Sequence, residues 1–429
     1  MKKIKCKILL ITLLAVLSEN VVLPQSSPFS AYGIGELYNN GFGRNYAMGG
    51  SGIGVRSKLY LNNMNPASYT AMDSLSFFFE AGIKGKFQTL VLNEKFSNSP
   101  KVDIGYLAFG FPITKFLFTS IGLRPATNTD YHFRGTPDTT TYNYIGKGNI
   151  SNLYGGLGIK LTRSLSLGAH FNFLFGDNSN FYTLQFKDPA AYKIGSKTET
   201  RINDLFMDFG IQYIFDLNKD KFIVGGTFSP KTGIRGKSTW VRGKGGNFDD
   251  NGFIIIEEYF YTNGIKDSIE YKWDGKNIEM PLGFGIGFSY IIDGRVTIAA
   301  DYATKRWGNV NLFGESDDNY KSANANYYSA GIEWVPNEVT GINYFERVRY
   351  RLGAHYSDDY IKYNNKQVKD MGISIGMGFP LRRTSTSINL SVDLGTKGIS
   401  DKTVSRENYG KVTLSFTMLE YWFMKNKIR

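Results

Sequence analysis

The chain has 429 residues, of which 15% are aromatic, 48 are Gly and only 12 are Pro, and its formal net charge is +12. After residue 25, no apolar run reaches the roughly 18 residues that a membrane-spanning helix requires, which excludes a helical membrane protein. No basic-aromatic cluster or nucleic-acid motif accompanies the positive charge. We therefore expect no nucleic-acid partner, and we attribute the charge to attraction toward phosphate-rich lipid headgroups.

The chain begins with a predicted signal peptide, residues 1–25. Its basic start is followed by an apolar run from Ile8 to Leu17, which is too short to cross a bilayer. Cys6 is the only cysteine and precedes this run, whereas a lipidated cysteine would follow it. We expect neither lipidation nor disulfide bonds in the mature chain.

Residues 26–73 show no alternation and combine many glycines with aromatic residues such as Tyr32, Tyr38 and Tyr46. A flexible linker would contain Gly and Ser without so many rings. A compact, irregular segment packed inside a larger structure fits this composition better. The segment is therefore predicted to be a hatch, or plug, in the lumen of the domain that follows.

Residues 74–429 alternate between apolar and small or polar residues with a period of two, which predicts strands around a lumen. The predicted fold is an all-β, transmembrane, antiparallel up-and-down β-barrel of about 14 strands, an even number as in other single-chain bacterial barrels. The expected strands are 74–92, 102–112, 115–127, 148–161, 164–187, 199–216, 221–240, 277–292, 295–308, 322–335, 347–358, 368–380, 385–397 and 406–423.

Connections between these strands alternate between short and long. Short turns face the periplasm in such barrels, so we expect an outer-membrane protein with both termini in the periplasm and the long connections outside. The connection 336–346 is the one long member of the short set. Segment 241–276 is the longest outer loop. Within it, residues 253–261 and 268–273 form either a projecting hairpin or two further wall strands, which would give sixteen.

The N-terminal segment resembles the hatch of the FadL family, the outer-membrane channels for long-chain fatty acids and other hydrophobic molecules. The resemblance rests on Gly41-Phe42-Gly43-Arg44-Asn45-Tyr46, a glycine cluster, Asn65-Pro66-Ala67 and Asp73 ahead of the first strand. It implies a fourteen-stranded barrel with a lumenal hatch, and it marks Arg44, Tyr46, Asn65 and Pro66 as candidate substrate-binding or gating residues. No ligand-contacting residue of the family is matched in the walls or loops. The same fold serves a secretion-system component resembling PorV.

The third predicted strand contains Gly122-Leu123-Arg124-Pro125. Proline cannot donate to the ladder of hydrogen bonds, so strands tolerate it at edges, ends and bulges. Members of the FadL family have a kink in the third strand that opens a side exit into the membrane. Gly122 and Pro125 therefore either mark a comparable opening or Pro125 ends the strand at the rim.

Strand parity places Arg347, Arg349 and Arg351 in the lumen. Arg349 is a candidate for holding a carboxylate, but such buried arginines also pair with lumenal acids, for which Glu80, Asp208, Asp301 and Asp393 are candidates. The three histidines, His132, His170 and His355, show no recognisable triad or metal spacing. We expect His132 in an outer loop and a polar lumenal role for His170 and His355, with no enzymatic activity, no cofactor and no metal.

These patterns favour passive uptake of a hydrophobic small molecule or lipid through a hatch-lined pocket and a side opening in the wall. The alternative is a scaffold or secretion-associated barrel, whose long outer loops hold a protein partner. The sequence does not identify the ligand or the oligomeric state.

Overall fold

The computed structural model describes residues 27–38, 41–92, 95–188, 191, 193–245, 268–310, 320–337, 343–381, 385–399 and 406–421. The predicted signal peptide lies outside these residues. None of the helices they form is long and apolar enough to cross a membrane. The helices are η1 (Pro28–Ala31), α2 (Gly43–Ala47), η2 (Pro66–Ala71), η3 (Trp307–Asn309) and η4 (Tyr344–Arg347). The strands are β1 (Glu36–Leu37), β2 (Ser76–Leu92), β3 (Lys95–Pro112), β4 (Leu117–Gly135), β5 (Thr140–Lys160), β6 (Leu165–Phe186), β7 (Lys193–Leu217), β8 (Asp220–Ser229), β9 (Thr232–Gly245), β10 (Ser268–Met280), β11 (Gly283–Ile292), β12 (Val296–Lys305), β13 (Tyr320–Ser322), β14 (Ala325–Trp334), β15 (Arg349–Tyr363), β16 (Lys366–Pro380), β17 (Ser387–Gly398) and β18 (Arg406–Tyr421).

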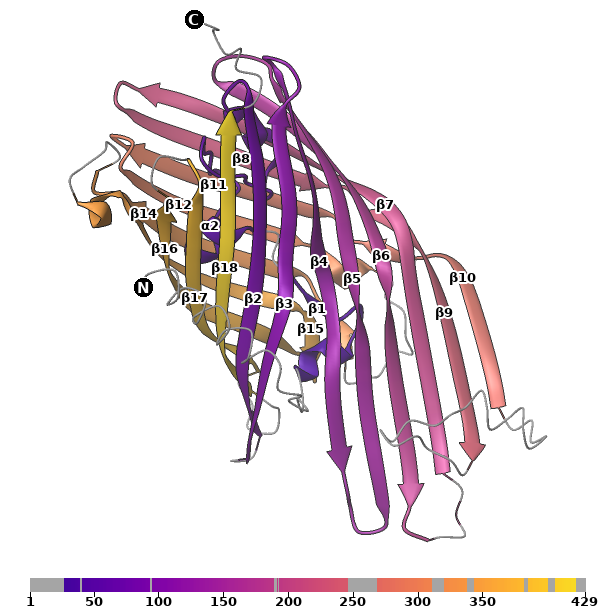
Figure 1. The fold of residues 1–429 in the computed structure, drawn as a ribbon. Coiled ribbons are helices and arrows are strands. Elements are labelled where there is room, and N and C mark those ends of the chain that lie inside the picture. The colour runs from indigo at the N-terminus through magenta and orange to yellow at the C-terminus, as the bar shows by residue number, and fades with distance from the viewer. Residues whose placement is uncertain are drawn as a thin grey trace, which may run out of the picture.

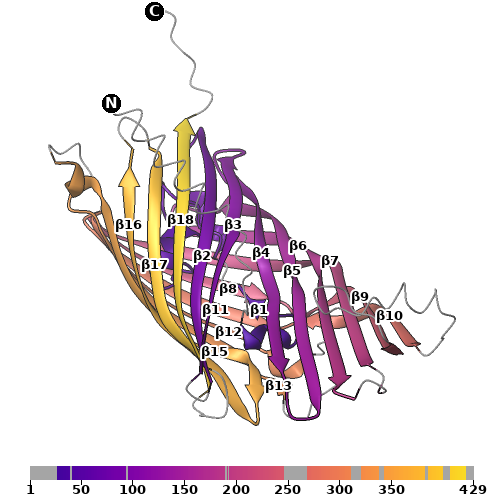
Figure 2. The same ribbon diagram turned by 60° about the horizontal axis from the view of Figure 1, so that its bottom comes forward.

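Strands β2 to β18 form one closed antiparallel barrel. The segment pairs β8 and β9, β10 and β11, and β13 and β14 are each one wall strand with a short break, so the seventeen segments make fourteen wall strands. The last strand pairs with the first over its whole length, from Arg406 opposite Val91 to Tyr421 opposite Ser76. Figure 2 shows β18 and β2 side by side at this closure. The prediction of a fourteen-stranded barrel is confirmed.

The two faces of each wall strand differ as the alternation predicts. In β17, Ile388, Leu390 and Leu394 are exposed on the outside, whereas Ser387 and Asn389 are buried in the lumen. Large apolar side chains are exposed in the same way on strands all around the barrel. An apolar outer belt around a polar lumen is the surface that a bilayer requires of a barrel.

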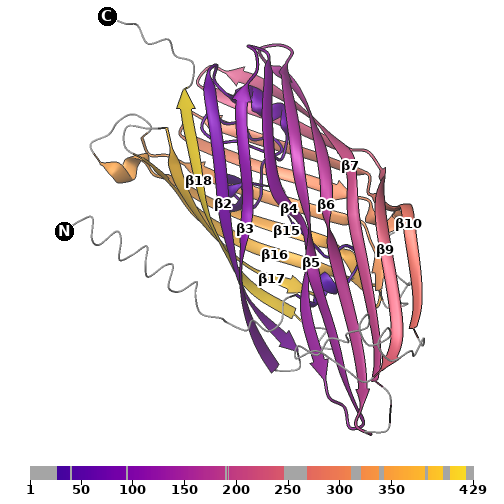
Figure 3. The same ribbon diagram turned by 45° about the vertical axis from the view of Figure 1, so that its right-hand side comes forward.

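Two predicted long connections, 93–101 and 128–147, are mostly strand in the structure. β3 already begins at Lys95, which makes most of the predicted loop 93–101 strand. β4 extends to Gly135 and β5 begins at Thr140, so most of the predicted loop 128–147 is strand as well. Sequence alternation failed to reveal this because polar residues appear on both faces beyond the apolar belt. Figures 1 and 3 show the resulting taller wall on the side of β4 to β7.

The predicted hairpin in segment 241–276 is also partly corrected. Residues 268–273, predicted as one arm of a separate hairpin, belong to β10 and pair with β9, with Ser268 opposite Gly243. They therefore lengthen two existing wall strands. The other predicted arm, residues 253–261, lies outside the described residues.

The N-terminal segment, described at residues 27–38 and 41–73, runs inside the barrel. Phe29 and Ile34 pack with Ile150, Trp307 and Tyr360 near the long connections. Residues 41–72 lie near the short turns, and the segment joins β2 there. Figure 1 shows α2 within the barrel and β1 toward the tall wall. The described chain thus starts at the opposite end of the lumen from the end of β18.

Wall glycines let this segment approach the barrel backbone closely. A Cβ atom on Gly353 of β15 would stand only 2.1 Å from the nitrogen of Gly49. Gly49 itself has a φ of +67°, a conformation that glycine adopts without strain. Gly225 faces Ile53 in the same way on the other side of the lumen. The N-terminal segment and the wall are therefore in contact at backbone level.

Replacing Gly353 with Val should push residues 48 and 49 off the wall. We expect a loss of about 1–3 kcal/mol, because added carbon atoms in a filled interior force backbone shifts. The measurement is thermal unfolding of the purified protein in detergent. Gly155→Ala is the matched control, because nothing lies within 4 Å of a Cβ at that wall position. Equal stability of both variants would contradict the close packing.

Candidate functional site: the lumenal cavity and the split wall

Arg44 of α2 joins the N-terminal segment to the wall through a buried carboxylate. Its guanidinium makes two bonds to Glu333 of β14, of 2.7 and 3.1 Å. Arg351 of β15 bonds the same carboxylate at 2.6 Å, and Arg349 lies 3.7 Å from it. Tyr60 completes the cluster, with all three guanidinium groups within 6 Å of its ring. Buried charges of this kind need partners, and here one acid holds three arginines.

This cluster shows which acid pairs with the arginines around residue 349. Arg349 and Arg351 pair with a wall acid, as one interpretation expected, but the acid is Glu333 and none of the four named candidates. Two of those candidates hold backbone of the N-terminal segment instead: Asp301 accepts from the amides of residues 52 and 53, and Glu80 accepts from Leu61. Arg347 belongs to η4 and to no wall strand, so the prediction from strand parity does not apply to it.

Asn65 and Pro66 shape the end of the segment near the short turns. The Asn65 side chain caps η2 by accepting from Ala67 and donates to the carbonyl of Ile53, and Pro66 occupies the first turn. Asn65 also reaches the wall carbonyl of Ile211 at 3.1 Å. The side chain that caps the helix thus also anchors it, which is a structural role for a candidate gating residue.

The histidines lie in polar networks. His170 is 2.7 Å from the hydroxyl of Tyr69 in η2, and His355 is 3.1 Å from the hydroxyl of Tyr409. His132 lies in β4 and is exposed, where the sequence predicted a loop. The described residues contain no group of three or more His, Cys, Asp or Glu side chains that could hold a metal ion.

The wall splits at Gly122 and Pro125. β3 and β4 pair only from Pro112 opposite Phe118 to Leu107 opposite Leu123, although both strands continue far beyond this point. Gly122 lies against the last pairs, because a Cβ there would stand 2.7 Å from the carbonyl oxygen of Leu107. Pro125 lies at a bulge in the pairing of β4 with β5, and β4 does not end there. Figure 1 shows β3 and β4 diverging, with β1 seen between them.

A cavity of about 440 Å³ occupies the lumen beside this split. One part of its lining is apolar and comes from the tall wall and its neighbours, with Leu174, Ile202, Phe206 and Ile234. Tyr46 and Pro66 line it from the N-terminal segment. Arg44 and Arg349 are not part of this lining and belong to the cluster around Glu333.

The rest of the lining is charged. Seven basic and seven acidic residues border the cavity, which is far more than a purely apolar ligand would need. Most of the basic groups have acidic partners at 4 Å or less: Lys86 and Lys397 with Glu36, Lys101 with Asp103, and Lys411 with Asp393. Glu36 lies between the ammonium groups of Lys86 and Lys397, which can compensate its negative charge.

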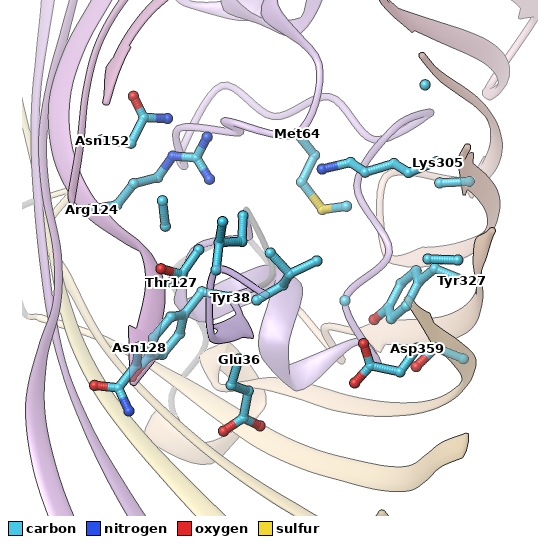
Figure 4. A pocket seen from close by; sticks show the side chains of 18 of the residues that line it. Glu36, Tyr38, Met64, Arg124, Thr127, Asn128, Asn152, Lys305, Tyr327 and Asp359 are labelled. Atoms are coloured by element: carbon cyan, nitrogen blue, oxygen red, sulfur yellow. The ribbon is translucent and has the colours of Figure 1, made fainter. Parts of the chain in front are cut away.

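Three other basic groups, Lys84, Arg124 and Lys305, also border the cavity. Lys84 donates to the hydroxyl of Tyr46 at 2.6 Å and lies 4.0 Å from the centre of its ring. The Arg124 guanidinium lies 6.0 Å from the ring of Tyr154. Figure 4 shows Arg124 and Lys305 extending toward each other from opposite sides of the cavity. Positive charge held by aromatic rings and an open cavity suits an anionic group of a ligand.

Most of these cavity charges could not be identified from the sequence. Arg124 stands inside the Gly-Leu-Arg-Pro stretch that was singled out for its glycine and proline, and Lys84 is one of several polar residues of β2. Lys84, Arg124 and Lys305 lie close together because strands one, three and nine of the barrel face the same lumen. The parity of each strand indicates which side chains point into the lumen. It does not indicate which distant strands face each other across the lumen.

The fold and the site define a class: a closed fourteen-stranded transmembrane barrel that carries its own N-terminal segment in the lumen, around a cavity beside a split wall. The sequence model of the BamG family matches residues 1–429, and the chain belongs to the BamG family. No curated protein matches the sequence.

Solved structures share the fold at low sequence identity. The Ralstonia pickettii toluene transporter TbuX has a TM-score of 0.59 at 12% identity, covering 89% of this chain and 98% of its own. A Pseudomonas aeruginosa FadL homologue has a TM-score of 0.58 at 11% identity, covering 91% and 100%. The Pseudomonas putida toluene transporter TodX has a TM-score of 0.54 at 14% identity, covering 90% and 100%. The predicted FadL-type fold is confirmed, while the family itself is BamG.

Replacing Glu333 with Gln should loosen the N-terminal segment. The change leaves three buried or half-buried arginines without their carboxylate, and we expect a loss of about 3–5 kcal/mol. The measurement is thermal unfolding together with limited trypsin digestion, in which cleavage after Arg44 and Arg56 should appear. Asp73→Asn, which breaks only the exposed pair with Lys58, is the control and should cost less than about 1 kcal/mol. An E333Q variant as stable and as resistant as the control would rule out the anchoring role.

Proposed function

We propose that this protein is an outer-membrane channel for the passive uptake of hydrophobic molecules that carry an anionic head, such as long-chain fatty acids. The observation that carries the proposal is the lumenal cavity itself, which places an apolar lining beside the basic groups of Lys84, Arg124 and Lys305. An amphiphile matches both parts: its chain contacts Leu174, Phe206 and their neighbours, and its head lies near the basic groups.

The structural neighbours support the transport of hydrophobic compounds and leave the substrate open. Two are toluene transporters by their titles, and toluene has no charge. The cavity of this chain is lined by seven basic and seven acidic residues, and among the basic ones Lys84, Arg124 and Lys305 could interact with a charged head in a way that an uncharged hydrocarbon does not offer. A charged head is therefore the better match for this lining.

The proposed route passes from the outer end of the lumen to the cavity and leaves sideways where β3 and β4 diverge, beside Gly122 and Pro125. The N-terminal segment fills the end near the short turns, where Arg56 bonds to Gln212 of β7 and Thr70 to Ser166 of β6. That packing disfavours a straight path into the periplasm. We propose no covalent chemistry along this route and hence no enzymatic activity.

Replacing Arg124 or Lys84 with Met should weaken binding of dodecanoate at least tenfold, which corresponds to about 1.4 kcal/mol. Binding of dodecanol, which has the same chain and no charge, should change less than twofold. Calorimetry on the purified protein in detergent measures both ligands. Lys58→Met is the matched control, because Lys58 is exposed and outside the cavity lining.

Mass spectrometry of solvent extracts of the purified protein tests the proposal without a chosen ligand. An anionic amphiphile present near one per barrel, and absent from an unrelated barrel in the same detergent, is the expected result. Only background lipid in the extract, together with no binding of dodecanoate or dodecanol, would overturn the proposal. A stoichiometric co-purifying protein would then favour the scaffold alternative, in which the long outer loops hold a partner.

A further inference from the structure

The split between β3 and β4 leaves one edge of β4 without a wall strand. Beyond Leu123, none of the described residues of β3 pairs with β4. In a membrane barrel each backbone amide and carbonyl needs a partner, because lipid offers none. The edge of β4 around residues 126–130 therefore has to be paired by something other than β3.

The N-terminal segment supplies that partner. β1 pairs antiparallel with β4, with Glu36 opposite Asn128 and Leu37 opposite Thr127. The amide of Tyr38 donates to the carbonyl of Ala126 at 3.0 Å. Further along the same edge, the Ser30 hydroxyl donates to the carbonyl of Asp130 at 3.1 Å and accepts from its amide at 3.2 Å. Residues 30–38 thus take the place of β3 along β4.

Side chains tie this replacement strand to the far side of the split. The Glu36 carboxylate lies 3.2 Å from Lys86 of β2 and 3.4 Å from Lys397 of β17. The Tyr38 hydroxyl donates to Asp103 of β3 at 3.2 Å. β1 is therefore bonded through its backbone to one side of the split and through its side chains to the other.

The surroundings of the split are polar, which lowers the cost of releasing β1. Lys101 of β3 reaches across to Asn128 at 2.8 Å and to Asp130 at 3.3 Å. The side chains of Asp103 and Asp130 are 36% and 41% exposed. Water that hydrates these groups can also hydrate the edge of β4, so the edge is not left bare when its partner leaves.

We propose that β1 is a gate: paired with β4, it closes the split between the lumenal cavity and the membrane, and Glu36 is the latch that holds it closed. The inference rests on the proposed function, because the gate controls the exit of that same cavity. Lys84 connects the two, since its ammonium group lies 5.3 Å from the Tyr38 ring and also borders the cavity. A ligand head that attracts Lys84 weakens this contact, and the gate opens when the cavity is filled.

Cysteine labelling tests the gate without any ligand. Thr127 is 3% exposed beneath β1, and the only natural cysteine is Cys6 in the predicted signal peptide. A T127C variant should react slowly with a maleimide in the otherwise unchanged protein. Adding Glu36→Gln removes the latch and should raise the labelling rate at least fivefold. A T119C variant is the matched control on the same strand, since Thr119 is 6% exposed and bonds within the wall, so E36Q should leave its rate unchanged.

Equal labelling of T127C with and without E36Q would overturn the role of Glu36 as latch. A rise at both T127C and T119C would show general loosening of the wall and would also overturn it.

A disulfide pin tests whether the gate controls exit. Tyr38 and Ala126 share a backbone hydrogen bond, so Leu37 and Thr127 form the next, non-hydrogen-bonded pair, in which Cα atoms are about 4.5 Å apart. That spacing suits a disulfide between L37C and T127C. Oxidation should slow transfer of bound dodecanoate to acceptor lipid vesicles at least tenfold, and reduction should restore it.

The control pin is F109C with I121C, which joins β3 to β4 where they already pair on the outer face. It should not alter transfer. Transfer at an unchanged rate in the oxidised L37C/T127C protein would overturn the gate and leave the proposed function standing. If dodecanoate fails to bind the unchanged protein, the proposed function fails, whereas the labelling result still decides whether Glu36 latches β1.

Discussion

The pairing of every strand edge is the constraint on which this structure depends. A barrel in lipid cannot leave backbone amides and carbonyls without partners, and closure of β18 on β2 meets that demand for the ends of the sheet. The divergence of β3 from β4 creates a second edge inside the closed barrel. The chain pairs it with two residues of its own N-terminal segment. The position of that segment, the cavity behind it and the polar groups beside it are all related to this pairing of β1 with β4.

Charge in the lumen serves two different purposes. Around Glu333, arginines from the wall and from α2 bond one carboxylate and lie away from the cavity, which favours a fixed structure. Around the cavity, Lys84 and Arg124 lie against aromatic rings, and space remains in front of them. The same residue types thus hold the N-terminal segment in one place and leave binding capacity in another. Strand parity alone does not distinguish these roles, because both sets point inward.

Much of the fold could be predicted from the sequence, because a period of two directly reports which face of a strand meets lipid. The number of wall strands and the apolar outer belt both followed from this period. The ends of β3, β4 and β5 could not be predicted, since beyond the belt both faces are polar and the period vanishes. Of the candidate site residues, Gly122 and Pro125 were informative because they act locally, through the missing donor and the missing Cβ. The partner of Arg349 and the grouping of Arg124 with Lys305 depend on which distant strands face each other, which local patterns do not contain.

The close contact between wall glycines and the N-terminal segment also constrains how the protein is assembled. Backbone of residues 48, 49 and 53 lies against Gly353 and Gly225 with no room for even a methyl group between them. Such close contact on opposite sides of the lumen makes it difficult to thread the segment into a finished barrel. It favours closure of the wall around the segment, with β18 joining β2 late in assembly. The order of synthesis agrees with such an assembly, because residues 27–73 are made before every wall strand.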